Sequence, residues 1–233
     1  SVYYFYSYFF IENDNNPINF SVPTGNFGDV YAGYLAKKIG LPLNKFVVAT
    51  NQNDILHRAI SNGTYNIENV SETITPSMDI QIASNFERLI YDLNNHSDEK
   101  TIEAMKSIRE KGKYVISKEN LDKINIDFLS SSTGENEILK TIKTVYEKFN
   151  IVLDPHSAIG YCAFDKVNLK GNNVVLATAH PCKFPDGIEK AINLKSELPN
   201  ELAFVLDEKE NYDIIENNLS KIKQHIKERI KWN

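Results

Sequence analysis

A glycine-containing turn at residues 22–29 (VPTGNFGD) constrains this chain more than any other segment. It follows the apolar run at residues 18–21 and precedes residues 30–39, which have good helix-forming character, so a strand, a tight turn and a helix are predicted. Such a turn leaves backbone N–H groups unpaired at the positive end of a helix dipole, where phosphate binds. Gly25 and Gly28 would let the backbone approach an anion and adopt angles that other residues avoid. Because a Gly-x-x-Gly spacing is common, the residues alone leave open a phosphate site and a plain turn.

Composition excludes several classes of protein. The chain has 233 residues, of which 42% are hydrophobic, enough for one large domain or two small ones. Its net charge of -5 gives no electrostatic reason to expect nucleic acid as a partner. No apolar run approaches the roughly 18 residues that cross a bilayer, so no membrane partner is predicted. Cys162 and Cys182 have neither metal-ligand spacing nor a disulfide framework, which favours a reducing cytoplasm and no metal.

The first residues of the chain are unusually aromatic. Residues 1–10 contain seven aromatic side chains and neither an initiator Met nor a capping residue. This pattern is typical of the middle of a buried or half-buried helix. We therefore predict that residues 1–16 are the remnant of a helix from an upstream part, and that its exposed aromatics promote self-association.

The rest of the chain alternates between strand and helix patterns, with a different block in the middle. Short apolar runs predict strands, and amphipathic segments predict helices, which together indicate an α/β fold with an open, mostly parallel sheet flanked by helices. We assign residues 17–63 and 151–233 to this α/β domain and residues 64–150 to a mainly helical insertion without a second sheet. The predicted strands are residues 20–22, 45–50, 151–153, 173–178 and 203–206, and the predicted helices outside the insertion are 30–39, 53–60, 155–164, 185–192 and 214–232.

Polar residues predict where helices begin. Asn53 is the expected N-cap of the helix that ends at Asn62-Gly63. Inside the insertion, the polar stretch 130–134 is expected to separate two helices, with Ser132 or Thr133 capping the second. In open α/β sheets, ligands bind beyond the carboxyl ends of the strands. The turns at residues 23–29, 50–54, 154–157 and 178–181 are therefore expected to face one crevice.

Five motifs in a fixed order carry a family resemblance that extends over roughly residues 1–190. Together these segments resemble threonine synthase, in the branch found in many bacteria and fungi. The resemblance implies the fold of tryptophan synthase β chains, pyridoxal 5'-phosphate as cofactor, and conversion of O-phospho-L-homoserine and water into L-threonine and phosphate. The motifs are residues 22–29 (VPTGNFGD), 49–56 (ATNQNDIL), 75–80 with 84–88 (TPSMDI and SNFER), 154–158 (DPHSA) and 177–184 (ATAHPCKF).

The resemblance also implies roles for individual residues. Asp29 is expected to cap the helix rather than contact the phosphate, because a carboxylate would repel it. Arg88 is the preferred candidate for binding a second phosphate, since its planar fork holds two oxygens. The implied cofactor-binding residues are Gly25, Asn26, Phe27, Gly28 and Asp29 at the phosphate and Thr178 near the pyridine nitrogen, and the implied substrate-binding residues are Ser77, Asn85, Arg88 and Lys183.

Each of these side chains also has a simpler interpretation. Without the resemblance, Arg88 and Lys183 would be read as solvated charges, and Asp79 as the cap of a following helix. A histidine after a strand, such as His156 or His180, more often satisfies backbone carbonyl groups than performs acid–base chemistry.

The lysine that forms the Schiff base is the main departure from the family pattern. The resemblance places it upstream of the aromatic helix, and no lysine of this chain stands in a matching context. We therefore expect no catalytic residue here and a chain that is inactive or nearly so by itself. The alternatives are a non-catalytic α/β module that binds a phosphorylated small molecule, and a scaffold fragment whose aromatic helix is an interface.

Overall fold

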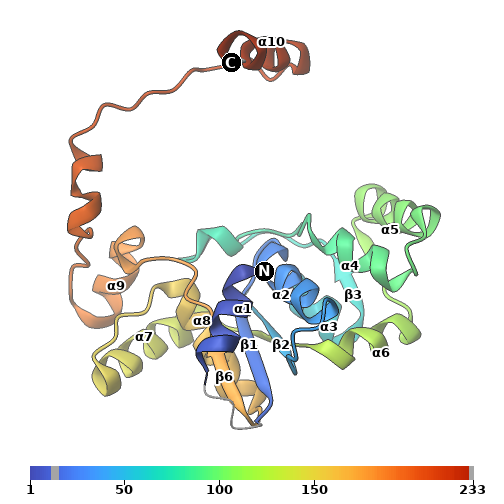
Figure 1. Ribbon diagram of the computed structural model, residues 1–233, viewed down its shortest axis with the longest axis horizontal. Coiled ribbons are helices and arrows are strands. Elements are labelled where there is room, and N and C mark those ends of the chain that lie inside the picture. The colour runs from blue at the N-terminus through green and yellow to red at the C-terminus, as the bar shows by residue number, and fades with distance from the viewer. Residues whose placement is uncertain (12–15, 231–233) are drawn as a thin grey trace. The chain divides into compact units, whose positions relative to one another are not determined.

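The computed structural model describes residues 1–11 and 16–230, in two compact units, Ser1–Ser196 and Glu197–Asn233. The first unit is built on a four-stranded parallel sheet in the order β5-β2-β1-β6 (Figure 1). The strands are β1 (Ile18–Pro23), β2 (Phe46–Thr50), β5 (Phe128–Ser132) and β6 (Asn172–Val175). Every residue of the two central strands is buried, as expected for a parallel sheet covered on both faces. The predicted open parallel α/β architecture is confirmed.

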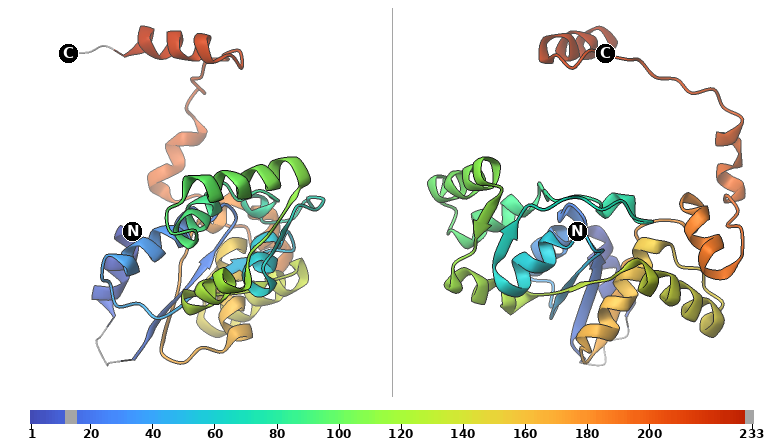
Figure 2. Two further views of the ribbon diagram at one scale, coloured as in Figure 1. Left: turned by 90° about the vertical axis from the view of Figure 1, so that its right-hand side faces the viewer. Right: turned by 180° about the vertical axis from the view of Figure 1, so that it is seen from behind.

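Alternate residues of β2 define the two faces of the sheet. Phe46 and Val48 belong to a core with α1 (Val2–Phe10), α2 (Gly28–Lys38), α3 (Ile55–Asn62) and α4 (Phe86–Leu93). Val47 and Ala49 belong to a second core with α7 (Glu135–Phe149), α8 (Pro155–Val167) and α9 (Pro185–Ile192). Figure 2 shows helices on both sides of the sheet. The sheet thus separates two apolar layers and carries its polar turns at its ends.

Helix α1 has one fully buried side chain, Tyr4, and its Phe5 and Tyr8 also pack against the core. The ring packs 4.8 Å from the Phe20 ring, centroid to centroid, and lies where a Cβ on Gly33 would stand. The Tyr4 hydroxyl donates to the Asp29 carbonyl at 2.9 Å and to the Asp29 carboxylate at 3.1 Å. Residues 12–15, which complete the predicted helix remnant, lie outside the described residues.

The middle of the chain departs from prediction at β5. Residues 130–132 were expected to separate two helices. They are instead part of this strand, which pairs in parallel with β2. The serines are accommodated because their hydroxyls are satisfied: Ser130 Oγ lies 2.9 Å from His57 Nδ1, and Ser132 Oγ donates to the Asn51 carbonyl at 3.0 Å.

A second sheet, which was not expected, is also present in the middle segment. It pairs β3 (Thr64–Asn66) antiparallel with β4 (Lys113–Val115). The segment is otherwise helical, with α4, α5 (Asp98–Lys111), α6 (Lys118–Asp127) and α7.

Two predicted strands are wrong. Residues 151–153 form no strand, and they lead to Asp154, whose side chain caps α8. Residues 203–206 lie in an exposed 3₁₀ helix, Asn200–Leu206, within the second unit. That unit also contains α10 (Leu219–Arg229), which is shorter than the predicted helix 214–232, and Trp232 lies outside the described residues. Strand β6 ends at Val175 rather than 178 and is half-buried, because it is an edge strand.

Two predicted caps are also wrong, since neighbouring residues take their places. Helix α3 begins after Asp54, and Asn53 instead binds a distant loop. Helix α7 begins after Gly134, whose N–H donates to the Glu137 carboxylate at 3.0 Å, rather than after Ser132 or Thr133.

Two other features are absent from the described ranges. Residues 1–11 and 16–230 contain no helix with the length and apolar character needed to span a bilayer. The same residues contain no cluster of three or more His, Cys, Asp or Glu side chains arranged to hold a metal ion.

The Tyr4 hydroxyl is predicted to stabilise the fold through Asp29. Tyr4→Phe keeps the ring packing and removes the hydroxyl, so we expect the free energy of unfolding to fall by about 1 kcal/mol. Tyr6→Phe is the matched control, because the Tyr6 side chain is exposed and should unfold like the parent chain. Denaturant titrations of the three proteins measure the difference, and equal midpoints for Tyr4→Phe and the parent would show that this hydrogen bond contributes nothing.

Candidate functional site

The loop between β1 and α2 lies at the carboxyl edge of the sheet. Phe27 holds the left-handed conformation there, with φ of 67°, and its ring is buried against Phe86 and Phe128. We expected Gly25 and Gly28 to supply the unusual backbone angles, but neither is among the positive-φ glycines of the described residues. The aromatic anchor therefore sets the turn, and α2 begins directly after it.

The two glycines serve close approach instead. A Cβ on Gly25 would collide with the carbonyl oxygen of Ser77, which lies on the short 3₁₀ helix Pro76–Met78. A Cβ on Gly28 would stand 3.1 Å from the side-chain nitrogen of Asn85. Two segments far along the chain thus press against the loop: a side chain at position 25 would require a backbone shift, and one at position 28 would require Asn85 to move by a few tenths of an ångström.

Polar contacts hold the loop backbone from the outside. The Asn26 side-chain oxygen accepts hydrogen bonds from the Ser84 N–H at 2.5 Å and the Ser84 hydroxyl at 2.9 Å. Asn85 donates from its side chain to the Asn26 carbonyl at 3.1 Å. Asn85, predicted to bind substrate, is therefore placed where it supports the loop.

The first turn of α2 receives no side-chain cap from any described residue. Asp29 does not cap the helix as expected, because its carboxylate accepts the Tyr4 hydroxyl instead. Burial and the neighbouring Asp29 charge raise the pKa of Tyr4 far above its usual value, so this hydroxyl remains a donor. The uncapped N–H groups at the start of α2 suit an anion.

A buried polar network fixes the segment that carries Ser77. The Asp79 carboxylate accepts hydrogen bonds from the side-chain nitrogens of Asn51 and Asn53, at 2.8 and 2.9 Å, and from the Thr73 hydroxyl at 2.7 Å. It also accepts the Thr73 N–H at 2.8 Å. Asn51 and Asn53 were expected to face the crevice and Asp79 to cap a helix; all three instead hold this loop in place.

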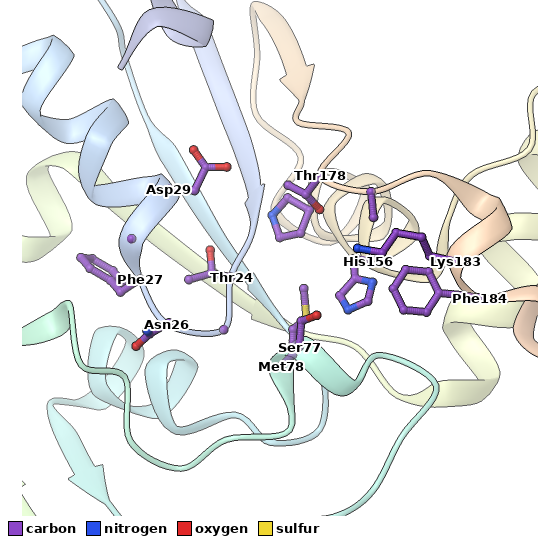
Figure 3. A pocket seen from close by; sticks show the side chains of 14 residues that line it. Thr24, Asn26, Phe27, Asp29, Ser77, Met78, His156, Thr178, Lys183 and Phe184 are labelled. Carbon is purple, nitrogen blue, oxygen red and sulfur yellow. The ribbon is translucent and has the colours of Figure 1, made fainter. Parts of the chain in front are cut away.

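These elements enclose a cavity of about 330 Å³ (Figure 3). It brings together the β1–α2 loop, Ser77, Thr178 and Lys183, which are separated by up to 160 positions in the sequence. The sequence predicted that the turn containing His156 faces this crevice, but it did not single out Met78 or Phe184 as lining residues. The cavity is lined by residues 23–29, Ser77, Met78, His156, Thr178, Ala179, Lys183 and Phe184.

Arg88 lies outside this cavity. Together with Asn85 it lines a neighbouring cavity of about 710 Å³, and its guanidinium group lies 5.9 Å from the centre of the Tyr31 ring. The structure therefore brings Ser77 and Lys183 to the loop and places Arg88 next to an aromatic ring elsewhere.

Asp154 and His156 form a buried pair at the start of α8. Asp154 Oδ1 accepts the His156 N–H at 2.9 Å and lies 3.3 Å from His156 Nδ1, and Oδ2 accepts the Ser157 hydroxyl. Burial tends to raise the pKa of Asp154, but the hydrogen bonds from His156 and Ser157 outweigh it and lower this pKa below its usual value. Asp154 is therefore an ionised cap that also orients the imidazole ring.

The two histidines after predicted strands differ in their partners. His180 Nδ1 accepts the Cys182 N–H at 3.2 Å, so it satisfies the backbone, although an N–H rather than a carbonyl. His156 Nε2 is buried and has no hydrogen-bond partner among the described residues. The simpler interpretation, in which His156 satisfies a backbone carbonyl group, is not seen: Nδ1 lies 3.3 Å from the Asp154 carboxylate, and Nε2 has no partner among the described residues.

Comparisons with known proteins give a consistent result. A family model described as "Threonine synthase, C-terminal" matches residues 157–226. Threonine synthase of Pseudomonas aeruginosa is 38% identical over 97% of this chain and 49% of its own length. That of Saccharomyces cerevisiae is 37% identical over 98% of this chain and 50% of its own length. The chain spans about half the length of the curated relatives it matches.

The solved structures agree with the sequence matches. A structure of threonine synthase from Brucella melitensis with bound PLP has a TM-score of 0.89 and 38% identity, covering 97% of this chain and 49% of that one. The yeast enzyme has a TM-score of 0.83 and 36% identity, covering 97% of this chain and 50% of that one.

The fold and the cavity define an α/β protein with a ligand pocket at the carboxyl edge of a parallel sheet. The matches are more specific than that class, because they extend over nearly the whole chain in both sequence and backbone. The chain belongs to the threonine synthase family, of which it represents a C-terminal portion.

The lowered pKa of Asp154 predicts a pH-dependent contribution to stability. An aspartate with a depressed pKa in the folded state stabilises the fold above its unfolded pKa, and this contribution is lost as pH falls through the folded pKa. Asp154→Asn preserves capping and removes the charge, so we expect it to be less stable than the parent by about 1–2 kcal/mol at pH 7. The gap should shrink below about pH 4, near the usual aspartate pKa.

The control for this measurement is Asp165→Asn, an exposed aspartate on the same helix. It should show no gap that closes with acid. Denaturant titrations at several pH values measure both variants, and a gap for Asp154→Asn that persists unchanged at pH 3 would contradict an ionised cap.

Proposed function

We propose that this chain carries the loop of a threonine synthase that binds the phosphate of pyridoxal 5'-phosphate. We call this loop, residues 25–29, the cup. The observation that supports this most directly is the β1–α2 loop, where the start of α2 lacks a side-chain cap from the described residues and lines the cavity. The related structure from Brucella melitensis was determined with PLP bound. On this proposal the family's reaction is the conversion of O-phospho-L-homoserine and water into L-threonine and phosphate.

The residues that line the cavity fit such a group. Backbone N–H groups of residues 25–28 and the dipole of α2 favour a phosphate. Lys183 adds a cation, and the partnerless His156 Nε2 lines the same space. When bound, the cofactor supplies an electron sink, while the protein orients it and tunes its electronics. Thr178 is proposed to lie near the ring nitrogen, in agreement with its position on the cavity wall.

Support for the proposed substrate residues is uneven. Ser77 and Lys183 share the cavity with the loop, which favours a role in binding O-phospho-L-homoserine. Asn85 supports the loop through Asn26, and Arg88 lines the adjoining cavity. For these two residues, the role as substrate contacts rests on the sequence resemblance alone.

Covalent catalysis is not proposed for this chain by itself. Lys183 is the one lysine among the described residues that line the cavity, and it stands in a motif different from that of the expected Schiff-base lysine. The alternative function, a non-catalytic module that binds a phosphorylated small molecule, uses the same loop. Both functions predict that the loop binds a phosphate group. They differ in activity: a catalytic lysine supplied by another segment would restore threonine synthesis in a threonine synthase portion but not in a non-catalytic module.

Cofactor binding and trapping test the proposal. Pyridoxal 5'-phosphate should bind saturably, and Gly25→Ala should weaken it about tenfold or more, because the new Cβ displaces the loop from Ser77. Gly134→Ala is the matched control, since the nearest atom to its Cβ is a flexible carboxylate oxygen at 3.8 Å. Borohydride treatment and mass spectrometry should reveal no stoichiometrically labelled lysine, and O-phospho-L-homoserine should release no phosphate.

Three outcomes would contradict these expectations in different ways. A chain that binds no pyridoxal 5'-phosphate would overturn the cup itself. A full label on Lys183, or clear phosphate release, would leave the cup in place and overturn the claim that this chain is not catalytic.

The aromatic face of α1 is proposed to mediate self-association. Tyr3, Phe9 and Phe10 are each at least 74% exposed, whereas Tyr4 is buried in the core of its own unit. We expect the chain to elute above its monomer mass of 26.6 kDa in size-exclusion chromatography, and Phe9→Glu to shift it toward monomer. Phe149→Glu, at a half-exposed aromatic on α7, should not produce this shift. A monomeric parent at all concentrations would contradict the proposed interface.

A further inference from the structure

His156 is the one residue lining the cavity with a buried polar side-chain atom, Nε2, that has no hydrogen-bond partner among the described residues. The residue is 3% exposed, and Asp154 and Ser157 beside it are 2% and 1% exposed. A buried nitrogen without a partner is costly, and most such atoms are satisfied by protein, water or ligand. A ligand that reaches Nε2 would therefore recover a hydrogen bond that the fold leaves unmade.

The ring is held in place by Asp154, which does not line the cavity, and by Phe184, which does. Nδ1 lies 3.3 Å from Asp154 Oδ1, which also accepts the backbone N–H of His156. The Phe184 ring packs 4.6 Å from the imidazole, centroid to centroid. Because the carboxylate is ionised and engages Nδ1, the remaining nitrogen, Nε2, is the atom available to a ligand.

The charges around the cavity favour an anion at this position. Lys183 supplies a positive charge from the segment after β6, and Figure 3 shows its side chain beside His156, across the cavity from the β1–α2 loop. Ser77 contributes a hydroxyl. Of the two carboxylates nearby, Asp154 is engaged by His156 and Ser157, and Asp29 by Tyr4. A cation, a hydroxyl and an imidazole facing one space are typical of a phosphate monoester site.

We propose that His156 is a ligand-binding residue of this cavity: its Nε2–H donates to a phosphate oxygen, and Asp154 is the positioning residue that fixes the ring for that contact. The inference rests on the proposed function and extends it by one residue. A phosphate group reaches this space from the cofactor or from a phosphorylated substrate.

Nuclear magnetic resonance of isotope-labelled histidine ring nitrogens tests the contact directly. Inorganic phosphate is titrated into the free chain and into the chain saturated with pyridoxal 5'-phosphate. We expect the His156 Nε2 signal to shift saturably. A shift with the cofactor alone assigns the contact to the cofactor phosphate, and a shift that needs added inorganic phosphate assigns it to a substrate phosphate.

Two substitutions at position 156 separate the role of each ring nitrogen. In His156→Asn the amide nitrogen stands near the position of Nδ1, so the contact with Asp154 is kept and the group at Nε2 is lost. We expect phosphate affinity to fall about tenfold or more, as for a charge-assisted hydrogen bond. In His156→Gln the amide nitrogen reaches the position of Nε2, so affinity should stay within about threefold of the parent. His96→Gln, at an exposed histidine on the surface, is the control and should leave affinity unchanged.

Asp154→Asn tests the positioning role. The variant should still fold, and the Gly25–Gly28 amide signals should still respond to phosphate. The phosphate affinity measured from the His156 Nε2 signal should fall about tenfold or more, as expected for His156→Asn. An unaltered His156 signal in a titration that moves the Gly25–Gly28 amides would overturn the inference and leave the cup standing. Failure of the chain to bind either phosphate or cofactor would overturn both.

Discussion

The structure depends on one strand, β1, and on its parallel pairing with a neighbour on each side. All six of its residues are buried, and it pairs with β2 along one edge and β6 along the other. The Ser21 hydroxyl, which would be costly inside an apolar layer, donates to the Gly160 carbonyl at 2.7 Å and so joins the strand to α8. The Thr24 N–H continues the ladder to the Ala49 carbonyl at 2.7 Å. The β1–α2 loop therefore leaves the sheet at a fixed point, next to the start of α8.

The other wall of the cavity depends on a partly buried carboxylate. Asp79 accepts hydrogen bonds from Asn51, Asn53 and Thr73, so its charge is spread over donors from two separate segments. This network fixes Pro76–Met78 against Gly25, where a side chain would collide. The cavity is thus shaped by contacts between segments more than twenty residues apart.

Local sequence predicted those parts of the fold whose stability is local or strongly apolar. The runs at β1 and β2 are continuous and buried, and Pro185 begins α9 where the sequence placed it. Strand β5 was missed because three of its five residues are serines, whose hydroxyls find partners on α3 and at Asn51 only once the chain is folded. Residues 203–206 are apolar but exposed, so hydrophobicity alone predicted a strand wrongly.

The same division holds at the site. The loop at residues 24–28 was predicted because its spacing and flanking elements are local, whereas the orphaned nitrogen of His156 was not. Asp154, two residues earlier, was noted only as part of a strand-end turn, and no pattern shows that its carboxylate also engages Nδ1. Asn51 and Asn53 were predicted to face the crevice because they follow a strand, but both side chains donate hydrogen bonds to the Asp79 carboxylate, which lies more than twenty residues away in the sequence. The role of each of these side chains depends on its burial and its hydrogen-bond partners, and these arise only when distant segments come together in the fold.

Helix α1 has a part in the electrostatics of the cavity as well as in packing. Asp29 lies in the first turn of α2, where a carboxylate is stabilised by the helix dipole but competes with a bound anion for the same N–H groups. The Tyr4 hydroxyl donates to this carboxylate from α1, and Figure 3 shows Asp29 directed away from Ser77 and His156. The Asp29 carboxylate is thereby hydrogen-bonded to the buried Tyr4 hydroxyl. Burial and the Asp29 charge raise the pKa of Tyr4, so this hydroxyl keeps the proton that it donates. The start of α2 can then offer its uncapped N–H groups to a phosphate, because the residue that would repel it is already bound.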